Sequence, residues 1–265
     1  MTMGAETTEE LLYTEKADRV GTIVINRPEK RNAFTHAMWL RLGILIEELE
    51  TDEAIKVIVL RSSDSHAFSA GADITEFREM RTKAGAVDVY DRAVRGTEAR
   101  LANCRKPTIA MISGFCVGGG CEVAVACDFR FAASSSTFGI TPANIGLVYS
   151  LTGTKRLVDL VGAANAKLML MSGALLDAQR SFSMGLVTRV CAEDELHEVT
   201  YTFARTVASK AQLTVQGAKR IVAMILGGVS SDNHESLALQ ELAYASADYH
   251  EGVDAFIAKR KPAFS

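Results

Sequence analysis

The segment FCVGGGCEVAVACD, residues 115–128, places three consecutive glycines directly before an apolar run that contains a single glutamate. The run predicts a buried helix with Glu122 in its first turn. The segment alone leaves two interpretations of Gly118–Gly120 open. The glycines form a tight turn from a strand into the helix, or their bare amides meet an anion at the positive end of the helix. A dinucleotide-binding motif is excluded, because GGGCEVA lacks the GxGxxG spacing.

A second segment, HAFSAGADITEF at residues 66–77, also puts small residues and a glycine between a strand and the start of a helix. If the amides of Ala70 and Gly119 converge, they form a two-donor pocket for a carbonyl oxygen that becomes negative during a reaction. Loss of one such donor typically costs roughly 3–4 kcal/mol. The pair of segments therefore predicts the centre of an enzyme.

The composition narrows the class of protein. With 48% hydrophobic residues among 265, the chain can bury a large core without disulfides or a structural metal. A net charge of -3 provides no basic surplus for nucleic acid or an anionic membrane. The five cysteines form no CxxC pair and the five histidines lie far apart, so we expect a reducing compartment and no metal.

The chain shows no targeting or spanning segment by sequence. Its first residues lack the basic and apolar regions of a secretory signal. The longest uncharged stretch, residues 131–154, is too polar to cross a bilayer. We therefore expect no membrane association and a cytoplasmic location.

The first half of the chain mixes strands with helices. Apolar and β-branched runs predict strands within residues 19–28, 55–62 and 107–115, and helical spacing predicts a helix at 35–52 with Thr35 as its N-cap. This alternation indicates an α/β fold. From about Ser150 the strand signal almost disappears, and helices are predicted within residues 151–162, 177–185, 194–211, 213–228 and 234–248.

Four segments in order resemble the crotonase (enoyl-CoA hydratase/isomerase) superfamily: NRPEKRNAF at 26–34, AFSAGADITEF at 67–77, GFCVGGGCEVAVACDFRFAA at 114–133 and EGVDAFIAKRKPAF at 251–264. The resemblance implies a spiral of ββα turns over residues 1–200, with a helical C-terminal extension at 201–265. It also implies a homotrimer or a dimer of trimers, an acyl-CoA thioester as substrate, and no cofactor besides the CoA that the substrate carries.

The same resemblance assigns site residues. It places the oxyanion hole on the backbone of Ala70 and Gly119 and identifies Glu122 as a catalytic glutamate, although an acidic residue also suits the first turn of a helix. The resemblance, with the motifs around it, assigns substrate contacts to Lys30, Arg31, Ala33, Ala70, Gly71, Ala72, Asp73, Ile74, Gly118, Pro142, Phe256 and Lys259. Phe256 and Lys259 match tail residues that reach CoA, often from the adjacent subunit. Asp73 could also serve as a helix N-cap.

One position departs from the hydratase pattern. In FGITPANIGLVYS at 138–150, Pro142 stands where a full hydratase has its second glutamate, and proline cannot carry a proton. Residues 131–153 are instead similar to the methylmalonyl-CoA decarboxylase branch, including Tyr149 as a catalytic candidate. That branch has a histidine where this chain has Ala72. Tyr149 could equally be a packing aromatic.

We therefore rank a hydratase-like acyl-CoA enzyme first, a carboxyacyl-CoA decarboxylase second and an enoyl-CoA isomerase third. An RNA-binding function without turnover, as in some relatives of the hydratases, ranks last. RNA binding needs a basic face, but the basic segments of this chain, residues 78–83 and 259–262, are short and lie beside acids. The resemblance also implies that residues 76–103 set the length of the acyl chain that fits.

Overall fold

The computed structural model describes residues 7–76 and 86–265. The basic segment at 78–83 and part of the segment at 76–103 therefore lie outside the described residues.

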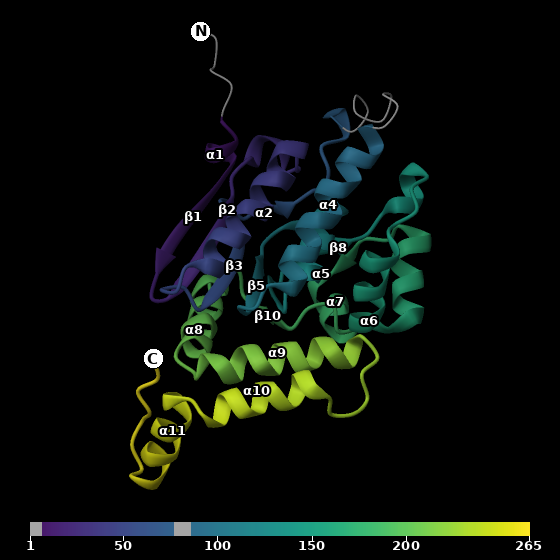
Figure 1. Cartoon of the computed structure of the whole chain (residues 1–265). Helices are drawn as coiled ribbons and strands as arrows, with labels where there is room; N and C mark the ends of the chain where they lie inside the picture. The colour runs from purple at the N-terminus through teal and green to yellow at the C-terminus, as the bar shows by residue number, and fades with distance from the viewer. Residues whose placement is uncertain (1–6, 77–85) are drawn as a thin grey trace.

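Strands of two sheets alternate along the chain (Figure 1). The larger sheet has the order β1-β2-β3-β5-β7-β10 and comprises β1 (Leu12–Ala17), β2 (Val20–Ile25), β3 (Val57–Ser62), β5 (Thr108–Ile112), β7 (Phe129–Ala133) and β10 (Arg189–Cys191). The smaller sheet has the order β4-β6-β8-β9 and comprises β4 (Ala67–Ser69), β6 (Phe115–Val117), β8 (Thr137–Gly139) and β9 (Leu176–Asp177). Strands β2, β3, β5 and β7 of the larger sheet run parallel to one another, and so do β4, β6 and β8 of the smaller sheet.

Each turn of the chain adds one strand to each sheet and then a helix. β5 and β6 lead into α5 (Gly119–Ala126), and β7 and β8 lead into α6 (Leu151–Ser172). β3 and β4 precede α4 (Ala86–Asn103) in the same way. The structure thus confirms the α/β class and the spiral of ββα turns. The spiral places the carboxyl ends of β4 and β6 side by side, and the two glycine-containing segments follow them.

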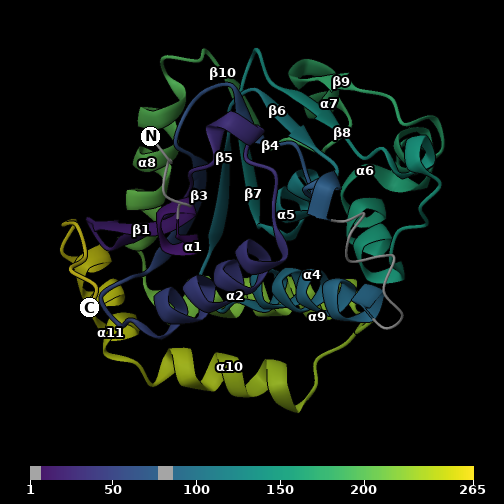
Figure 2. The ribbon, with the colours of Figure 1, turned by 90° about the horizontal axis from the view of Figure 1, so that it is seen from above.

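The inner strands of the larger sheet are buried on both faces, as expected for parallel strands covered on each side, whereas β1 at its edge is largely exposed. Alternate residues such as Ile23, Ile58 and Leu60 pack with α2 (His36–Thr51), whose helical apolar stripe the sequence predicted. Their neighbours Val57 and Val59 pack against α8 (Leu196–Ala208). Figure 2 shows α8 on one side of β3, β5 and β7 and α5 on the other.

The predicted strands and helices are present, and Thr35 caps α2 by accepting a hydrogen bond from Met38 N at 3.2 Å. The sequence missed β1, which pairs with β2 through a turn whose residues Asp18 and Arg19 both have positive φ. It also missed β7, whose sequence FRFAA has no β-branched residue, and β8, β9 and β10, because strands of two or three residues are too short for a periodic pattern.

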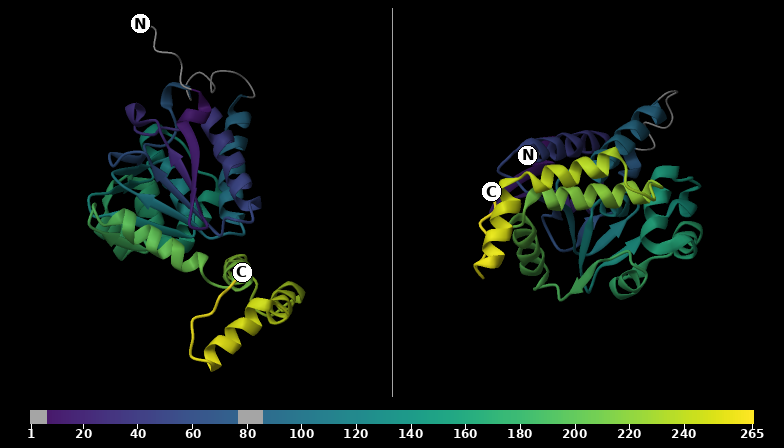
Figure 3. Two further views of the ribbon diagram at one scale, coloured as in Figure 1. Left: turned by 90° about the vertical axis from the view of Figure 1, so that its left-hand side faces the viewer. Right: turned by 60° about the horizontal axis from the view of Figure 1, so that its bottom comes forward.

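The C-terminal helices follow α8. They are α9 (Gln212–Leu226), α10 (His234–Tyr244) and α11 (Ala247–Ile257), and Figure 3 shows α10 and α11 extending beyond the body. Lys219 of α9 is held to the body, since its Nζ donates to Asp128 Oδ2 at 2.6 Å and to the Lys106 carbonyl at 3.0 Å. The boundary expected at residue 200 falls inside α8, which packs on the sheet. The division itself stays a prediction.

The remaining elements are short: α1 (Thr8–Leu11), α7 (Ala178–Ser183) and two 3-10 turns, η1 (Pro28–Lys30) and η2 (Pro142–Ile145). All five cysteines are free thiols, and every one except Cys191 is buried. Within residues 7–76 and 86–265, no helix has the length and apolarity needed to cross a membrane. The same residues contain no cluster of three or more His, Cys, Asp or Glu suited to a metal ion.

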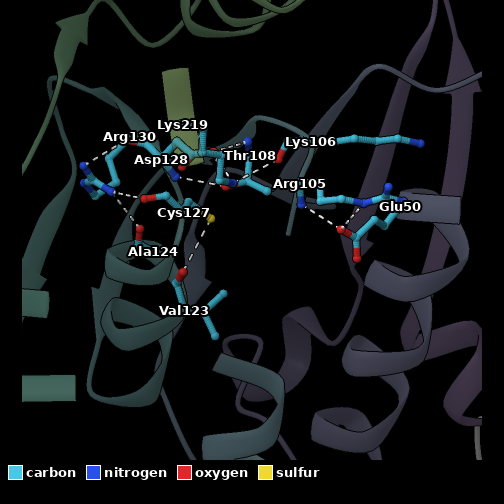
Figure 4. Close-up of polar contacts among 10 residues, drawn as sticks. All are labelled: Glu50, Arg105, Lys106, Thr108, Val123, Ala124, Cys127, Asp128, Arg130 and Lys219. Carbon is cyan, nitrogen blue, oxygen red and sulfur yellow. Dashed lines mark hydrogen bonds and ion pairs between the residues drawn. The ribbon is translucent and has the colours of Figure 1, made fainter. Parts of the chain in front are cut away.

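A buried arginine fixes the end of α5 opposite the glycines (Figure 4). Arg130 is 3% exposed, and its guanidinium donates to the carbonyls of Cys127 at 2.6 Å, Ala124 at 3.2 Å and Leu186 at 2.6 Å. Carbonyls at the end of a helix have no intrahelical partner, and a cation there also suits the negative end of the helix dipole. Arg130 therefore anchors the helix that carries Gly119 and Glu122.

We expect Arg130→Met to lower the free energy of unfolding by about 3 kcal/mol or more, because it leaves several buried carbonyls without a donor. Urea denaturation followed by circular dichroism measures this change. The matched control is Arg205→Met on the exposed face of α8, where Arg205 pairs with Glu198, and it should change stability by less than about 1 kcal/mol. Equal effects of the two substitutions would contradict the anchoring role.

Candidate active site

A cavity of about 290 Å³ opens between the start of α5, the loop after β4, the helices α2 and α4, and the segment from η2 to α6. It brings together eight residues that the sequence singled out: Ala70, Ala72, Ile74, Gly118, Gly119, Glu122, Pro142 and Tyr149. These residues are spread over 80 positions of the chain, so the spiral rather than local sequence assembles them.

The loop after β4 is held by hydrogen bonds to the segment at 26–34. Asn32 Nδ2 donates to the Ala67 carbonyl at 2.6 Å, and Ser69 Oγ donates to the Asn32 carbonyl at 2.7 Å. Further along, Phe34 N donates to the Gly71 carbonyl at 2.7 Å. Two of the four family-like segments therefore lie side by side, and the loop after β4 contributes Ala70, Ala72 and Ile74 to the wall of the cavity.

The backbone pairing corrects one prediction. Ala70 N donates to the Arg31 carbonyl at 2.9 Å, so this amide is already used inside the fold and the prediction that it forms the oxyanion hole is wrong. Gly71 O and Asp73 N both pair with Phe34. Because successive peptide groups of an extended segment point to opposite sides, the Ala72 amide points away from Phe34. In the described part of the chain no group accepts a hydrogen bond from Ala72 N, and Ala72 lines the cavity.

The glycines explain how a second amide reaches the same point. Gly118 has φ 56° and ψ -128°, a conformation that side-chain-bearing residues avoid, and it turns the chain from β6 into α5. A Cβ on Gly120 would lie 2.5 Å from the Ser69 carbonyl, so this residue lets α5 approach β4. Gly119 is the first residue of α5, where the backbone N–H has no intrahelical partner.

The amides of Ala72 and Gly119 are close neighbours. A Cβ on Gly119 would lie 3.7 Å from Ala72 N, and a Cβ on Gly71 would lie 3.0 Å from Gly119 N. The ring of Trp39 also packs on Gly119, with Cζ2 3.1 Å from the same Cβ position. Two donors and the start of a helix thus meet beside an apolar ring, which is the arrangement that stabilises an oxyanion.

Glu122 lies one turn further along α5 and keeps part of its surface facing the cavity. Burial, reinforced by the neighbouring carboxyl of Glu98, raises the pKa of Glu122 well above its ordinary value. Burial, with the carboxyl of Glu122 nearby, also raises the pKa of the Tyr149 phenol, which therefore stays neutral and can donate a hydrogen bond.

Glu98 of α4 was not found from the sequence. It lines the same cavity and is only 2% exposed. Its Oε2 lies 3.4 Å from Nη1 of Arg156, whereas its Oε1 is buried and has no hydrogen-bond partner within the described residues. Burial raises the pKa of Glu98 to about 7 although Arg156 opposes this shift. In the sequence Glu98 is one acid among the charged residues of an amphipathic helix, which gave no signal for a site.

Several of the predicted substrate contacts lie outside the cavity. Lys30 and Arg31 are exposed at the end of η1, with the Arg31 guanidinium 5.8 Å from the centre of the Phe115 ring, and Ala33 is half-buried beside them. Phe256, at the end of α11, is 85% exposed and lines a separate groove among the C-terminal helices. Lys259 lies just beyond that helix. Within one chain the fold does not bring Phe256 or Lys259 into the cavity.

Asp73 holds the end of the loop. Its carboxylate accepts from Arg27 Nη1 at 2.7 Å and from Thr75 N at 3.0 Å, so it also caps the helical turn that follows. Partial burial favours a higher pKa, but the hydrogen bonds from Thr75 and Arg27 outweigh it and lower the pKa of Asp73 to about 2. Asp73 is therefore a structural carboxylate at neutral pH.

The amides of Ala72 and Gly119 lie close together at the cavity, with the carboxyl groups of Glu122 and Glu98 beside them. This arrangement suits an enzyme that stabilises a carbonyl oxygen as it becomes negative and moves a proton next to it. Comparison with known proteins agrees with an enzyme of this kind. Residues 15–265 match the family model of enoyl-CoA hydratase/isomerase. This chain belongs to that family and is a hydratase-like acyl-CoA enzyme of the crotonase superfamily.

Individual relatives extend over nearly the whole chain. This chain is 37% identical over 257 residues to a Rhizobium meliloti protein named "Probable enoyl-CoA hydratase", and the alignment covers 96% of this chain and 98% of that protein. It is 32% identical to a crotonyl-CoA hydratase of Syntrophomonas wolfei, with 96% and 98% covered. Among solved structures, an enoyl-CoA hydratase/isomerase family protein from Hyphomonas neptunium has a TM-score of 0.94 at 32% identity, with 98% and 99% covered.

Proposed function

We propose that the chain catalyses the reversible addition of water to the C2–C3 double bond of an enoyl-CoA thioester. The observation that carries this proposal is the position of the Glu122 carboxyl, which faces the same cavity as the unpaired amides of Ala72 and Gly119. A thioester oxygen bound by both amides would be stabilised when water adds at C3 and negative charge moves onto it. Glu122 is then placed to move the proton at the neighbouring C2.

Binding of the CoA part is also a proposal. The amides of Ala72 and Gly119 fix the thioester, and the exposed side chains of Lys30 and Arg31 are free to meet the CoA phosphates. Ala33 and the loop from Ala70 to Ile74 would lie along the chain that links the phosphates to the thioester. No cofactor other than the substrate's own CoA enters this scheme.

We further propose that the C-terminal helices join copies of the chain into a trimer or a dimer of trimers. Large apolar side chains are exposed along α9–α11, including Ile225, Leu242, Phe256 and Ile257. Exposed apolar surface of this kind usually marks an interface. In such an assembly Phe256 and Lys259 of a neighbouring subunit would reach the CoA, which they cannot do within their own chain.

The cavity gives less support to decarboxylation of a carboxyacyl-CoA. A substrate carboxylate needs a free cation, but Arg95 pairs with Asp91 at 3.3 Å and Arg156 lies beside Glu98. The carboxyls of Glu98 and Glu122 would oppose a further negative charge in a poorly solvated site. Tyr149, the side chain that the decarboxylase branch would use, does line the cavity, and the amides of Ala72 and Gly119 would serve either reaction.

The test is to incubate the purified full-length protein with crotonyl-CoA and, separately, with methylmalonyl-CoA. We expect conversion of crotonyl-CoA to 3-hydroxybutyryl-CoA, which chromatography of the thioesters measures. We expect no release of carbon dioxide from methylmalonyl-CoA. Rapid decarboxylation of methylmalonyl-CoA without hydration of crotonyl-CoA would replace the proposed function by the alternative.

A further inference from the structure

A hydration reaction that proceeds through acid and base catalysis needs two proton-handling groups, but the loop that carries Pro142 supplies none. Pro142 is buried and lines the cavity as the first residue of η2, so its place in the site is filled by a ring without a titratable proton. Another wall of the same cavity, α4, presents the buried carboxyl of Glu98.

We propose that Glu98 is the second carboxyl group of the reaction, taking the proton of the attacking water while Glu122 delivers a proton to C2. This inference rests on the proposed function. It assigns a catalytic role to a side chain on α4 that neither the family-like segments nor the glycine motif contains.

The geometry of Gly153 shows that the two carboxyl groups face one point. A Cβ on Gly153 would lie 3.2 Å from Glu122 Oε1 and 4.0 Å from Glu98 Oε2. Gly153 belongs to the first turn of α6, where the Ser150 hydroxyl accepts its N–H at 3.0 Å. The absence of a side chain at this position leaves room for both carboxyls, which come from α4 and α5 and meet the positive end of a third helix.

The unused oxygen of Glu98 points to a ligand. A carboxylate oxygen that is buried without a hydrogen bond is costly, and such groups in native proteins require an explanation. Glu98 Oε1 is in this state, while Oε2 faces Arg156. A water molecule held between Glu98 Oε1 and the substrate would satisfy the oxygen and provide the nucleophile.

The surrounding charges favour different protonation states for the two carboxyls. Glu98 has the Arg156 guanidinium at 3.4 Å, whereas Glu122 faces the carboxyl of Glu98. Arg95 and Asp91, on the same helix as Glu98, pair with each other at 3.3 Å, and Tyr149 is neutral. Two carboxyls in one poorly solvated site do not both ionise easily. Above the pKa of Glu98, about 7, the pair therefore holds one proton, on Glu122, and one negative charge, on Glu98 beside Arg156.

The step balances with these states. As the water oxygen bonds to C3, its proton passes to the Glu98 carboxylate, the C2–C3 double bond opens, and charge moves onto the thioester oxygen between Ala72 and Gly119. The enolate collapses as C2 takes the proton of Glu122. Glu98 is then protonated and Glu122 ionised, and transfer of one proton from Glu98 to Glu122 restores the starting state.

The experiment compares Glu98→Gln with the wild type, with Glu47→Gln as the matched control. Glu47 is an exposed acid of α2 whose ion pair with Arg100 lies on the surface. For crotonyl-CoA hydration we expect kcat of E98Q to fall by about 10²–10³-fold with KM changed less than about threefold, because one proton-transfer group is lost. E47Q should match the wild type.

A second readout separates catalysis from structural damage. In D₂O the ionised fraction of Glu122 can exchange the C2 protons of butyryl-CoA without any water addition, and mass spectrometry follows the deuterium. We expect E98Q to keep this exchange within about fivefold of the wild type, whereas Glu122→Gln should lose it. An E98Q variant that loses exchange and hydration to the same degree would overturn the proposed role of Glu98.

The pH profile gives a third readout. Glu98 must be ionised to accept a proton, and burial raises its pKa to about 7, so wild-type kcat/KM should rise as pH increases through this value. E98Q should lose that rise. Unimpaired hydration by E98Q would overturn the role of Glu98 alone. Absence of hydration by the wild type would instead overturn the proposed function.

Discussion

Replacement of Glu122 by glutamine is expected to lower kcat for crotonyl-CoA hydration by about 10³-fold or more while KM changes little. Glutamine has nearly the same shape as glutamic acid, so the cavity and the start of α5 should be preserved. It cannot release a proton to C2, which is the step assigned to Glu122. Initial rates and KM of the purified variant, with its melting temperature as a check on folding, measure the effect.

The same variant distinguishes the competing reactions. Decarboxylation to an enolate depends mainly on the oxyanion hole, so a decarboxylase should keep much of its activity when Glu122 is replaced. A Glu122→Gln protein that hydrates crotonyl-CoA at more than about a tenth of the wild-type rate would contradict the role of Glu122, since general acid–base catalysis is worth at least about 10².

Replacement of Gly119 by proline is expected to lower kcat by about 10²–10³-fold, the usual effect of losing one donor from an oxyanion hole. Proline has no backbone N–H, but it suits the first position of a helix, where that N–H has no intrahelical partner. Gly119 occupies this position in α5. The substitution therefore removes the donor with a smaller disturbance than proline causes elsewhere in a helix.

Gly119→Ala is the control for the added carbon atoms. Its Cβ would lie 3.1 Å from the Trp39 ring, as the proline Cβ would, but the alanine keeps its N–H. We expect G119A to be at least about tenfold more active than G119P in kcat for crotonyl-CoA. Equal losses in both variants would mean that crowding against Trp39, rather than the missing donor, is responsible.

The sequence predicted the part of the site that is encoded locally. Three glycines before an apolar run indicate a turn and a helix, and they also place Glu122 in the first turn. The β-branched runs predict the central strands because their residues are buried on both faces of the sheet. These features depend on near neighbours in the chain.

The choice between Ala70 and Ala72 could not be made from the sequence. Both are small residues beside Gly71, and both line the cavity. Which amide is free depends on how the loop pairs with residues 31–34, since Arg31 O takes the Ala70 amide and Phe34 leaves the Ala72 amide unpaired. That pairing joins segments about 40 positions apart.

Glu98 escaped prediction for a similar reason. It lies 24 positions before Glu122 on an amphipathic helix, where it is one of several charged residues. Only the packing of α4 against α5 brings Glu98, together with Asp91, to the wall of the cavity. The CoA contacts proposed for Phe256 and Lys259 depend on the proposed assembly of several chains, so they stay predictions.

The most direct test of the account is a crystal structure of the protein with butyryl-CoA, a saturated thioester that cannot be hydrated. We expect the thioester oxygen to lie within about 3.2 Å of both Ala72 N and Gly119 N, with C2 facing Glu122. A thioester oxygen that faces solvent, or that contacts neither of these two amides, would contradict it.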